Sequence, residues 1–168
     1  VARVLNMPYP GGPHIDRLAH EATEAVPFPR VWLEEGSYDF SFSGLKSAVI
    51  NYKHNMDQRG EEIIPEKVAK GFQDSVVEVL TAKTVRAARE FHVKQVIAAG
   101  GVSANKGLRT ALDNAFKEEG VPFFVPPLKL CTDNAAMIGA AAYQMYEAGV
   151  RGNLAMHGRP GMELISWK

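Results

Sequence analysis

Residues 95–105 read QVIAAGGVSAN. An apolar run from Val96 to Ala99 precedes two glycines, and Ser103 and Asn105 follow, which is typical of a buried strand that turns through glycines into a helix. Glycines let the backbone approach a ligand, and the first amides of a helix carry a partial positive charge. The pattern predicts either a phosphate or nucleoside site or an ordinary connection in which Ser103 is the N-cap.

A second helix start follows at residues 131–136, which read CTDNAA. Asp133 is expected at or near the start of an alanine-rich helix, where it could be the N-cap, a metal ligand or both. One carboxylate cannot form a zinc or iron site, because such sites need three or more protein groups. The five histidines include no pair four residues apart and no His-Glu-x-x-His, so this chain alone cannot form a zincin protease site.

Helices and strands alternate around the glycine turn. Apolar residues recur at three- and four-residue spacings after Pro65 and predict the longest helix, with one face in the core. The further elements expected are a strand at 95–99, a helix at about 104–117, a strand at 122–125 and a helix at about 133–147. This α-β-α-β-α order predicts an α/β fold with helices covering at least one side of a sheet.

The first third of the chain has a different pattern. Prolines and glycines at 8–13 predict a tight loop, with Pro13 at the first position of a short helix. Alternation at 38–42 suggests a strand pair, Ser43 would cap a helix to about residue 56, and 57–62 would form a mobile loop. We expect one lobe comprising peripheral helices and the strand pair at 1–64, core βα units at 65–150 and a C-terminal tail at 151–168.

Composition limits the class of protein. The 168 residues are 46% hydrophobic and carry 19 basic and 19 acidic side chains, which suits one domain or one lobe of a larger protein. With zero net charge, any nucleic-acid contact must come from a local basic face, and the charges of the long helix are expected to form a solvated face. The single Cys131 excludes an internal disulfide.

No signal peptide and no apolar run of roughly 20 residues is visible, so we expect a cytoplasmic protein without a membrane segment. Residues 1–5 have a helix-like apolar pattern with no initiator methionine and no N-cap before them. We therefore expect the chain to start inside an element of a longer protein.

Two further positions could contact a ligand. Gly12 and Asp16 lie one helical turn apart, so a backbone amide could bind a phosphate or carbonyl while the carboxylate binds ribose hydroxyls. An ordinary turn with a solvated aspartate is the simpler alternative. Lys46 falls in the first turn of its helix, where the dipole disfavours a cation. A nearby phosphate or acidic partner would offset that cost, and a solvated lysine is the alternative.

Four segments together resemble the bacterial TsaD family, formerly called Gcp or O-sialoglycoprotein endopeptidase: YPGGPHID at 9–16, FSFSGLK at 40–46, GGVSAN at 100–105 and TDNAAMI at 132–138. The resemblance covers nearly the whole chain but only about the C-terminal half of such a protein. It implies the C-terminal lobe of an actin/Hsp70/sugar-kinase (ASKHA) type fold. It also implies transfer of threonylcarbamoyl from threonylcarbamoyl-adenylate to N6 of adenosine 37 in tRNA.

The resemblance also implies ligands and partners. Asp133 matches the ligand of a divalent metal, iron or zinc, which two histidines of an N-terminal His-x-x-x-His motif complete; that motif is absent here. ATP or threonylcarbamoyl-adenylate would be the nucleotide, and tRNA with TsaB-like and TsaE-like proteins would be the partners. No residue is singled out as a general base, and the fragment alone is not expected to catalyse. The residues matched to substrate or nucleotide binding are Gly12, Asp16, Gly100, Gly101, Ser103 and Asn105.

Three other functions are compatible with parts of the pattern. A metalloprotease, as the older family name says, would need a zinc site to which this chain contributes at most one ligand. An ATPase or sugar kinase of the same fold would need a catalytic carboxylate and phosphate loops from another lobe. A non-catalytic interaction lobe would bind partner proteins without binding nucleotide.

Overall fold

The computed structural model describes residues 1–155, 157, 158, 160 and 161. They fall into two compact units, Val1–Thr132 and Asp133–Lys168. Part of the predicted C-terminal tail at 151–168 lies outside the described residues.

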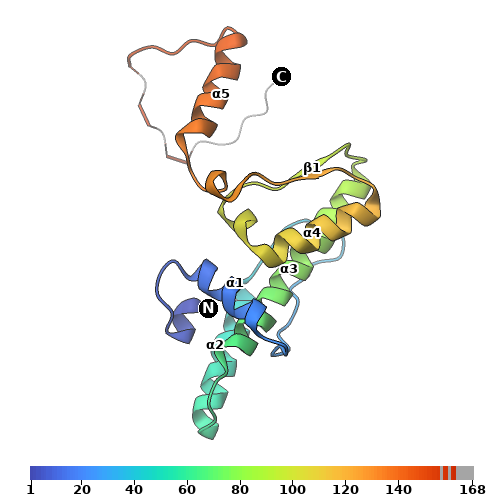
Figure 1. Ribbon diagram of the computed structural model, residues 1–168, viewed down its shortest axis with the longest axis vertical. Helices are drawn as coiled ribbons and strands as arrows, with labels where there is room; N and C mark the ends of the chain where they lie inside the picture. Colours follow the sequence, from blue (N-terminus) through green and yellow to red (C-terminus); the bar gives the residue numbers. More distant parts are fainter. Residues whose placement is uncertain (156, 159, 162–168) are drawn as a thin grey trace. The chain divides into compact units, whose positions relative to one another are not determined.

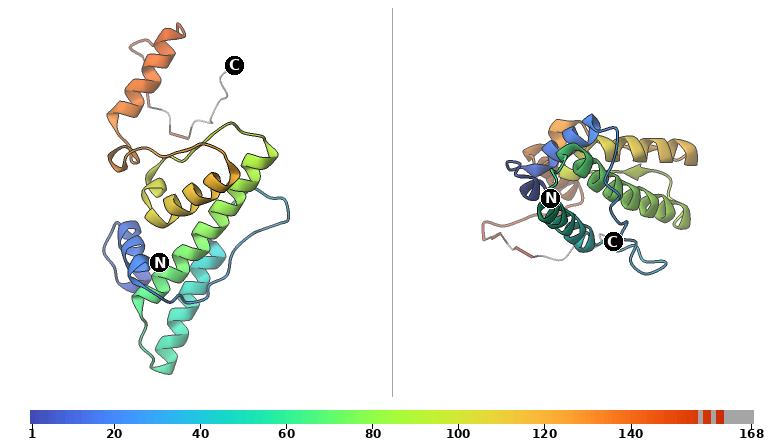
Figure 2. Two further views of the ribbon diagram at one scale, coloured as in Figure 1. Left: turned by 45° about the vertical axis from the view of Figure 1, so that its right-hand side comes forward. Right: turned by 90° about the horizontal axis from the view of Figure 1, so that it is seen from below.

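The first unit is organised around α3 (Pro65–Glu90), the long helix that the sequence predicted (Figure 1). Pro65 stands in its first turn, where a missing N–H removes no helical hydrogen bond. Both α1 (Gly11–Glu21) and α2 (Ser43–Arg59) lie along α3 (Figure 2). Gly71 permits close approach of the chain, because a Cβ there would lie 2.0 Å from the carbonyl oxygen of Val26.

Apolar side chains join these helices in two clusters. One joins Ile15, Leu18 and Ala19 of α1 to Ala69 of α3, and the short 3-10 helix η1 (Ala2–Leu5) packs against it. The other contains Phe28, Leu45, Val49 and Val68. Burying one such large apolar side chain contributes about 1.5–3 kcal/mol. The first cluster holds α1 on α3, and this contact places Asp16.

A small parallel sheet completes the unit. The strands β1 (Val96–Ile97) and β2 (Phe123–Phe124) pair with Val96 opposite Phe123, and α4 (Lys106–Glu119) connects them. Val96 and Phe123 pack toward a third cluster of Ala88, Leu108, Leu112 and Phe116. Ile97 and Phe124 are 63% and 53% exposed. The predicted mixed α/β fold is confirmed, with strands shorter than expected.

The predicted strand pair at 38–42 is wrong, because residues 38–42 form no strand. Cationic side chains of α3 bind the carbonyl groups that a strand partner would have paired. Lys83 Nζ donates to the carbonyl of Asp39 at 2.6 Å, and Arg86 Nη2 donates to those of Gly36 and Ser37. These two charges therefore do not belong to a solvated face, and Lys83 is only 4% exposed.

Two helix starts and one loop also differ from expectation. Helix α1 begins at Gly11, so Pro13 is its third residue, still within the turn whose N–H groups lack helical partners. Ser43 is the first residue of α2 and does not cap it by a side-chain hydrogen bond. The helix continues to Arg59 and ends at Gly60 with φ 66°, so four of the six residues of the predicted loop at 57–62 are helical or cap the helix.

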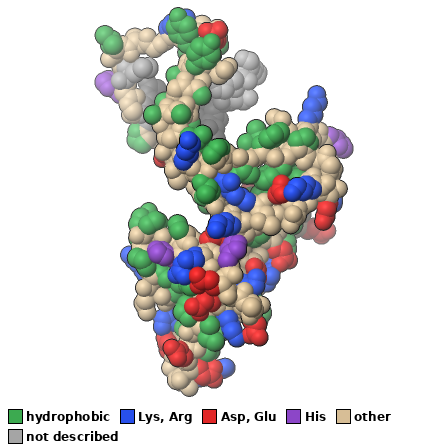
Figure 3. Space-filling model, viewed as in Figure 1, with side chains coloured by type: hydrophobic (Ala, Val, Ile, Leu, Met, Phe, Trp, Pro, Cys, Tyr) green, Lys and Arg blue, Asp and Glu red, His purple; other side chains and the backbone are tan. Residues whose placement is uncertain are grey.

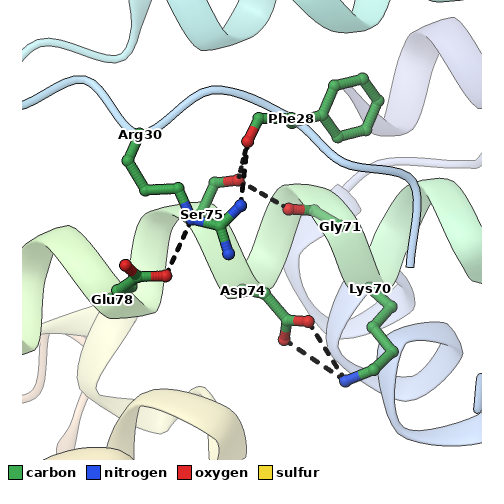
Figure 4. Close-up of polar contacts among 7 residues, drawn as sticks. All are labelled: Phe28, Arg30, Lys70, Gly71, Asp74, Ser75 and Glu78. Atoms are coloured by element: carbon green, nitrogen blue, oxygen red, sulfur yellow. Dashed lines mark hydrogen bonds and ion pairs between the residues drawn. The ribbon is translucent and has the colours of Figure 1, made fainter. Parts of the chain in front are cut away.

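Other polar contacts on α3 hold residues 26–30 against the helix (Figure 4). Ser75 Oγ donates to the carbonyls of Gly71 at 2.8 Å and Phe28 at 3.3 Å. Arg30 donates to the same Phe28 carbonyl at 2.9 Å and to Glu78 at 2.8 Å. These contacts give this part of α3 a structural role. On the face of the molecule shown in Figure 3, acidic and basic side chains are interspersed.

The second unit contains α5 (Ala135–Glu147), close to the predicted helix at 133–147. No residue of α5 is buried, although the helix is largely apolar. Ile138, Tyr143 and Tyr146 are 63%, 60% and 59% exposed. Over the described ranges, no helix is both long and apolar enough to cross a membrane.

Candidate functional site

The glycine turn has a backbone shape that requires glycine at its first position. Gly100 has φ 88° and ψ 170°, which L side chains rarely adopt. The chain continues as the 3-10 helix η2 (Gly101–Ala104), and Ser103 Oγ donates back to the carbonyl of Gly100 at 2.6 Å. Gly100, Gly101 and Val102 are exposed, so the outer side of the turn is open to a ligand.

Asn105, and not Ser103, is the N-cap of α4. Its Oδ1 accepts the backbone N–H of Leu108 at 2.8 Å, whereas the Ser103 hydroxyl closes the turn. The alternative in which Ser103 is the cap is wrong, because η2 precedes the start of the helix. Both ends of the Asn105 amide are engaged, since its Nδ2 donates to Gln73 Oε1 at 2.7 Å.

Gln73 orients Asn105 from the buried side. It is 7% exposed on α3, and a Cβ at position 107 would lie 2.7 Å from its Nε2. Gly107 therefore leaves room for the Gln73 side chain beside the helix start. Gln73 was not predicted from the sequence. The available signal was a polar residue next to the apolar stripe that includes Ala69 and Phe72.

Asp16 meets the same helix start from α1. Its Oδ2 accepts the backbone N–H of Lys106 at 3.1 Å, directly after the cap residue Asn105. An anion is stabilised there by the helix dipole and the unpaired first amides. The reading of Asp16 as an ordinary solvated helix residue is therefore wrong: its side chain is 14% exposed and contacts another element.

The second carboxylate oxygen of Asp16 lacks a hydrogen-bond donor among the described residues. Asp16 Oδ1 is buried and accepts no hydrogen bond from the described part of the chain. His20 Nδ1 lies 3.5 Å from it but only 2.7 Å from the backbone oxygen of Asp16, so the His20 contact is with the backbone. A buried oxygen without a donor is costly. A ligand hydroxyl beside Lys106 could supply that donor.

No contact with Asp16, Asn105 or their neighbours requires a glycine at position 12. It is exposed, and nothing lies within 4 Å of an ideal Cβ built on it. The neighbouring Gly11 is the one required by packing, since its Cβ would lie 2.3 Å from that of Ala2. Gly12 is located on α1 one turn before Asp16, and its role as a ligand contact stays a prediction.

Arg109 is a further residue that the sequence analysis missed. Its Nε donates to the carbonyl of Ser103, and its Nη2 lies 2.9 Å from both the carbonyl of Pro126 and Cys131 Sγ. It thus joins η2 to the segment after β2. The sequence offered only a weak signal, an arginine next to the buried Leu108 on α4.

Comparison with known proteins decides the family. Residues 1–140 match the family model described as "TsaD: tRNA N6-adenosine threonylcarbamoyltransferase". The chain belongs to the TsaD family. All four segments that carried the resemblance, 9–16, 40–46, 100–105 and 132–138, lie within the matched residues.

Curated relatives with the name tRNA N6-adenosine threonylcarbamoyltransferase agree. The chain is similar to those of Geobacillus thermodenitrificans (61% identical over 98% of this chain and 48% of the relative) and Bacillus subtilis (58% over 100% and 49%). It is also similar to that of Staphylococcus epidermidis (58% over 98% and 48%). The chain therefore spans about half the length of the curated relatives it matches.

The described residues contain no complete site for the metal that TsaD membership implies. Asp133 is exposed, and the N-cap of α5 is Asn134, whose Oδ1 accepts the N–H of Met137 at 3.0 Å. The expectation that Asp133 would be the N-cap is wrong, so capping does not use its carboxylate. Among the described residues, no group of three or more His, Cys, Asp or Glu side chains could hold a metal ion. Asp133 could supply one carboxylate ligand, and its role as a metal ligand stays a prediction.

Proposed function

We propose that this chain is part of a tRNA N6-adenosine threonylcarbamoyltransferase and forms one wall of its nucleotide site. The observation that carries the proposal is the hydrogen bond from the Lys106 amide to Asp16 Oδ2. It joins Asp16 of the first family motif to the residue that directly follows the motif at 100–105, 90 residues later in the sequence. The small parallel sheet and its helices are consistent with the C-terminal lobe of an actin/Hsp70/sugar-kinase fold.

The wall would bind the nucleotide part of threonylcarbamoyl-adenylate or ATP. The exposed backbone at Gly100 and Gly101 can approach a phosphate closely, because the two glycines have no side chains of their own. Asp16 Oδ1 would accept a ribose hydroxyl, which fits a buried carboxylate oxygen that lacks a donor. Ser103 and Asn105 would act mainly by fixing the turn, and Gly12 would contribute its amide.

In the proposed reaction, N6 of adenosine 37 attacks the carbonyl carbon of threonylcarbamoyl-adenylate. A C–N bond forms, the bond from that carbon to the phosphate oxygen breaks, and AMP leaves with the electron pair while N6 loses a proton. This chain would hold the leaving nucleotide in one orientation, which lowers the entropic cost of the transfer. The described residues do not form a metal site, so no step is assigned to a metal.

The principal test is Asp16→Asn in the full-length protein. Loss of the charge-assisted contact should weaken ATP binding by about 10- to 100-fold, with a matching loss of threonylcarbamoyl transfer to tRNA at limiting adenylate. Asp113→Asn is the matched control, because Asp113 lies on the surface of α4 and pairs with Lys117. Equal ATP affinity in Asp16→Asn and the wild type would contradict the assigned role of Asp16.

A second arm separates transferase from protease. In the full-length protein, Asp133→Ala should lower both bound metal and tRNA modification, if Asp133 is a ligand. Unchanged metal content with unchanged modification would reject that role. Proteolysis of a defined substrate that is lost in Asp133→Ala, without tRNA modification by the wild type, would favour the metalloprotease.

The same proposal implies a cellular location and binding partners for the full-length protein. A tRNA substrate implies a cytoplasmic location, and the TsaB-like and TsaE-like partners inferred from the resemblance belong to the full-length protein. Binding of tRNA would use a local basic surface, since the chain has no net charge.

A further inference from the structure

Arg109 binds both the glycine turn and the segment that follows β2. The first is η2, where the carbonyl of Ser103 accepts from Arg109 Nε. The second is the stretch after β2, where Arg109 Nη2 donates to the carbonyl of Pro126 and to Cys131 Sγ, each at 2.9 Å. The same stretch contains η3 (Leu128–Leu130) and leads to Thr132. Arg109 is thus placed between the two segments.

The two segments also approach each other directly. An ideal Cβ on Gly101 would lie 4.0 Å from Thr132 Cγ2. Cys131 is 3% exposed, and its Sγ lies 3.6 Å from the carbonyls of both Pro126 and Pro127. The position of Thr132 beside Gly101 therefore depends on a buried corner that Arg109 helps to close.

An arginine suits this position better than a lysine would. The planar guanidinium presents five N–H donors in fixed directions, so a single side chain can serve Ser103 on one side and Pro126 with Cys131 on the other. A lysine ammonium is a compact charge on a flexible stem and cannot keep these acceptors in the same geometry. Without the guanidinium, at least one buried carbonyl would lose its donor.

We propose that Arg109 is a positioning residue for the nucleotide-binding turn. It holds η2 and residues 126–132 in the relative position that the ligand needs, so that binding does not have to order them. Arg109 acts through the turn and does not itself touch the nucleotide. This inference rests on the proposed function, because it assumes that the turn binds a nucleotide.

The test compares Arg109→Lys with Arg86→Lys in the full-length protein. Arg86 is a matched control because it also donates to two backbone carbonyls, those of Gly36 and Ser37, but it holds a different segment. Both variants keep the charge and should lose similar thermal stability. Only Arg109→Lys should weaken ATP binding, by about 10-fold, while kcat at saturating threonylcarbamoyl-adenylate stays close to that of the wild type.

A second measurement reports on the corner itself. Cys131 is buried, so its alkylation, followed by mass spectrometry of its peptide, should be slow in the wild type and in Arg86→Lys and faster in Arg109→Lys. ATP should slow the reaction in the wild type.

Three results would count against the inference. Unchanged ATP affinity in Arg109→Lys would overturn it and leave the proposed function intact. Equal loss of affinity in both variants would also overturn it, since a general loss of stability would then explain the effect. Absence of ATP binding and tRNA modification in the wild type would overturn the proposed function, and the inference with it.

Discussion

The starts of α4 and α5 use the same local chemistry in different surroundings. Asn105 and Asn134 each accept the backbone N–H three residues later, at 2.8 Å and 3.0 Å. At α4 the cap also binds Gln73 of α3, and the amide of Lys106 binds Asp16 of α1. Helix α4 buries three residues, whereas α5 buries none.

The difference separates a helix start that is capped by its own residue from one that other elements also hold in place. A capping asparagine needs only its own helix, because donor and acceptor lie within one turn. A ligand site also needs groups from other elements, which hold its backbone in place and orient its side chains. In this chain α1 and α3 supply those groups to the start of α4.

The largest expected effect separates the two caps. Asn105→Ala removes the cap of α4 and leaves Gln73 Oε1 buried without its donor, which should cost about 2–4 kcal/mol. Asn134→Ala should cost about 1 kcal/mol, the usual value for a lost cap. Amide hydrogen exchange at Leu108 and Met137 measures each local opening. Equal costs would mean that the contact with Gln73 adds nothing to the start of α4.

An intermediate effect should come from Gln73 itself. Gln73→Met keeps the length of the side chain but deprives Asn105 Nδ2 of its acceptor, which should cost about 1–2 kcal/mol. Gln144→Met on the exposed α5 is the matched substitution and should change stability by less than about 0.5 kcal/mol. Urea unfolding followed by circular dichroism compares the two variants. A larger effect at position 144 would reverse the contrast between the helices.

The smallest effect concerns pH and the other end of α4. The Arg89 guanidinium, by hydrogen bonding, holds the pKa of the Glu119 carboxyl below its ordinary value of 4.5. Glu119 therefore stabilises the folded chain above pH 4.5, and this contribution is lost as pH falls through the lowered pKa. Glu119→Gln should flatten the dependence of Tm on pH in that acid range. Because the pair is exposed, added salt should shrink the difference, and a salt-independent difference would point to another cause.

The sequence was most informative where the deciding interactions are local. The apolar spacing after Pro65 predicted α3, and the glycines after Val96 predicted the turn that leads into α4. It failed at 38–42, because alternation favours a strand but cannot show that Lys83 and Arg86 bind the carbonyls there. The alternative in which Ser103 caps the helix also failed, because η2 lies between Gly100 and the start of α4.

For the candidate site, the residue types were predictable and their arrangement was not. The sequence by itself determined the helices, the parallel strand pair around α4 and the motifs that carry the family, because periodicity and turn chemistry act over a few residues. Only the tertiary structure decided that Asp16 faces the amide of Lys106, that Gln73 holds Asn105 and that Arg109 joins the turn to residues 126–131. These contacts depend on how α1, α3 and α4 pack, and no local pattern in the chain encodes that packing.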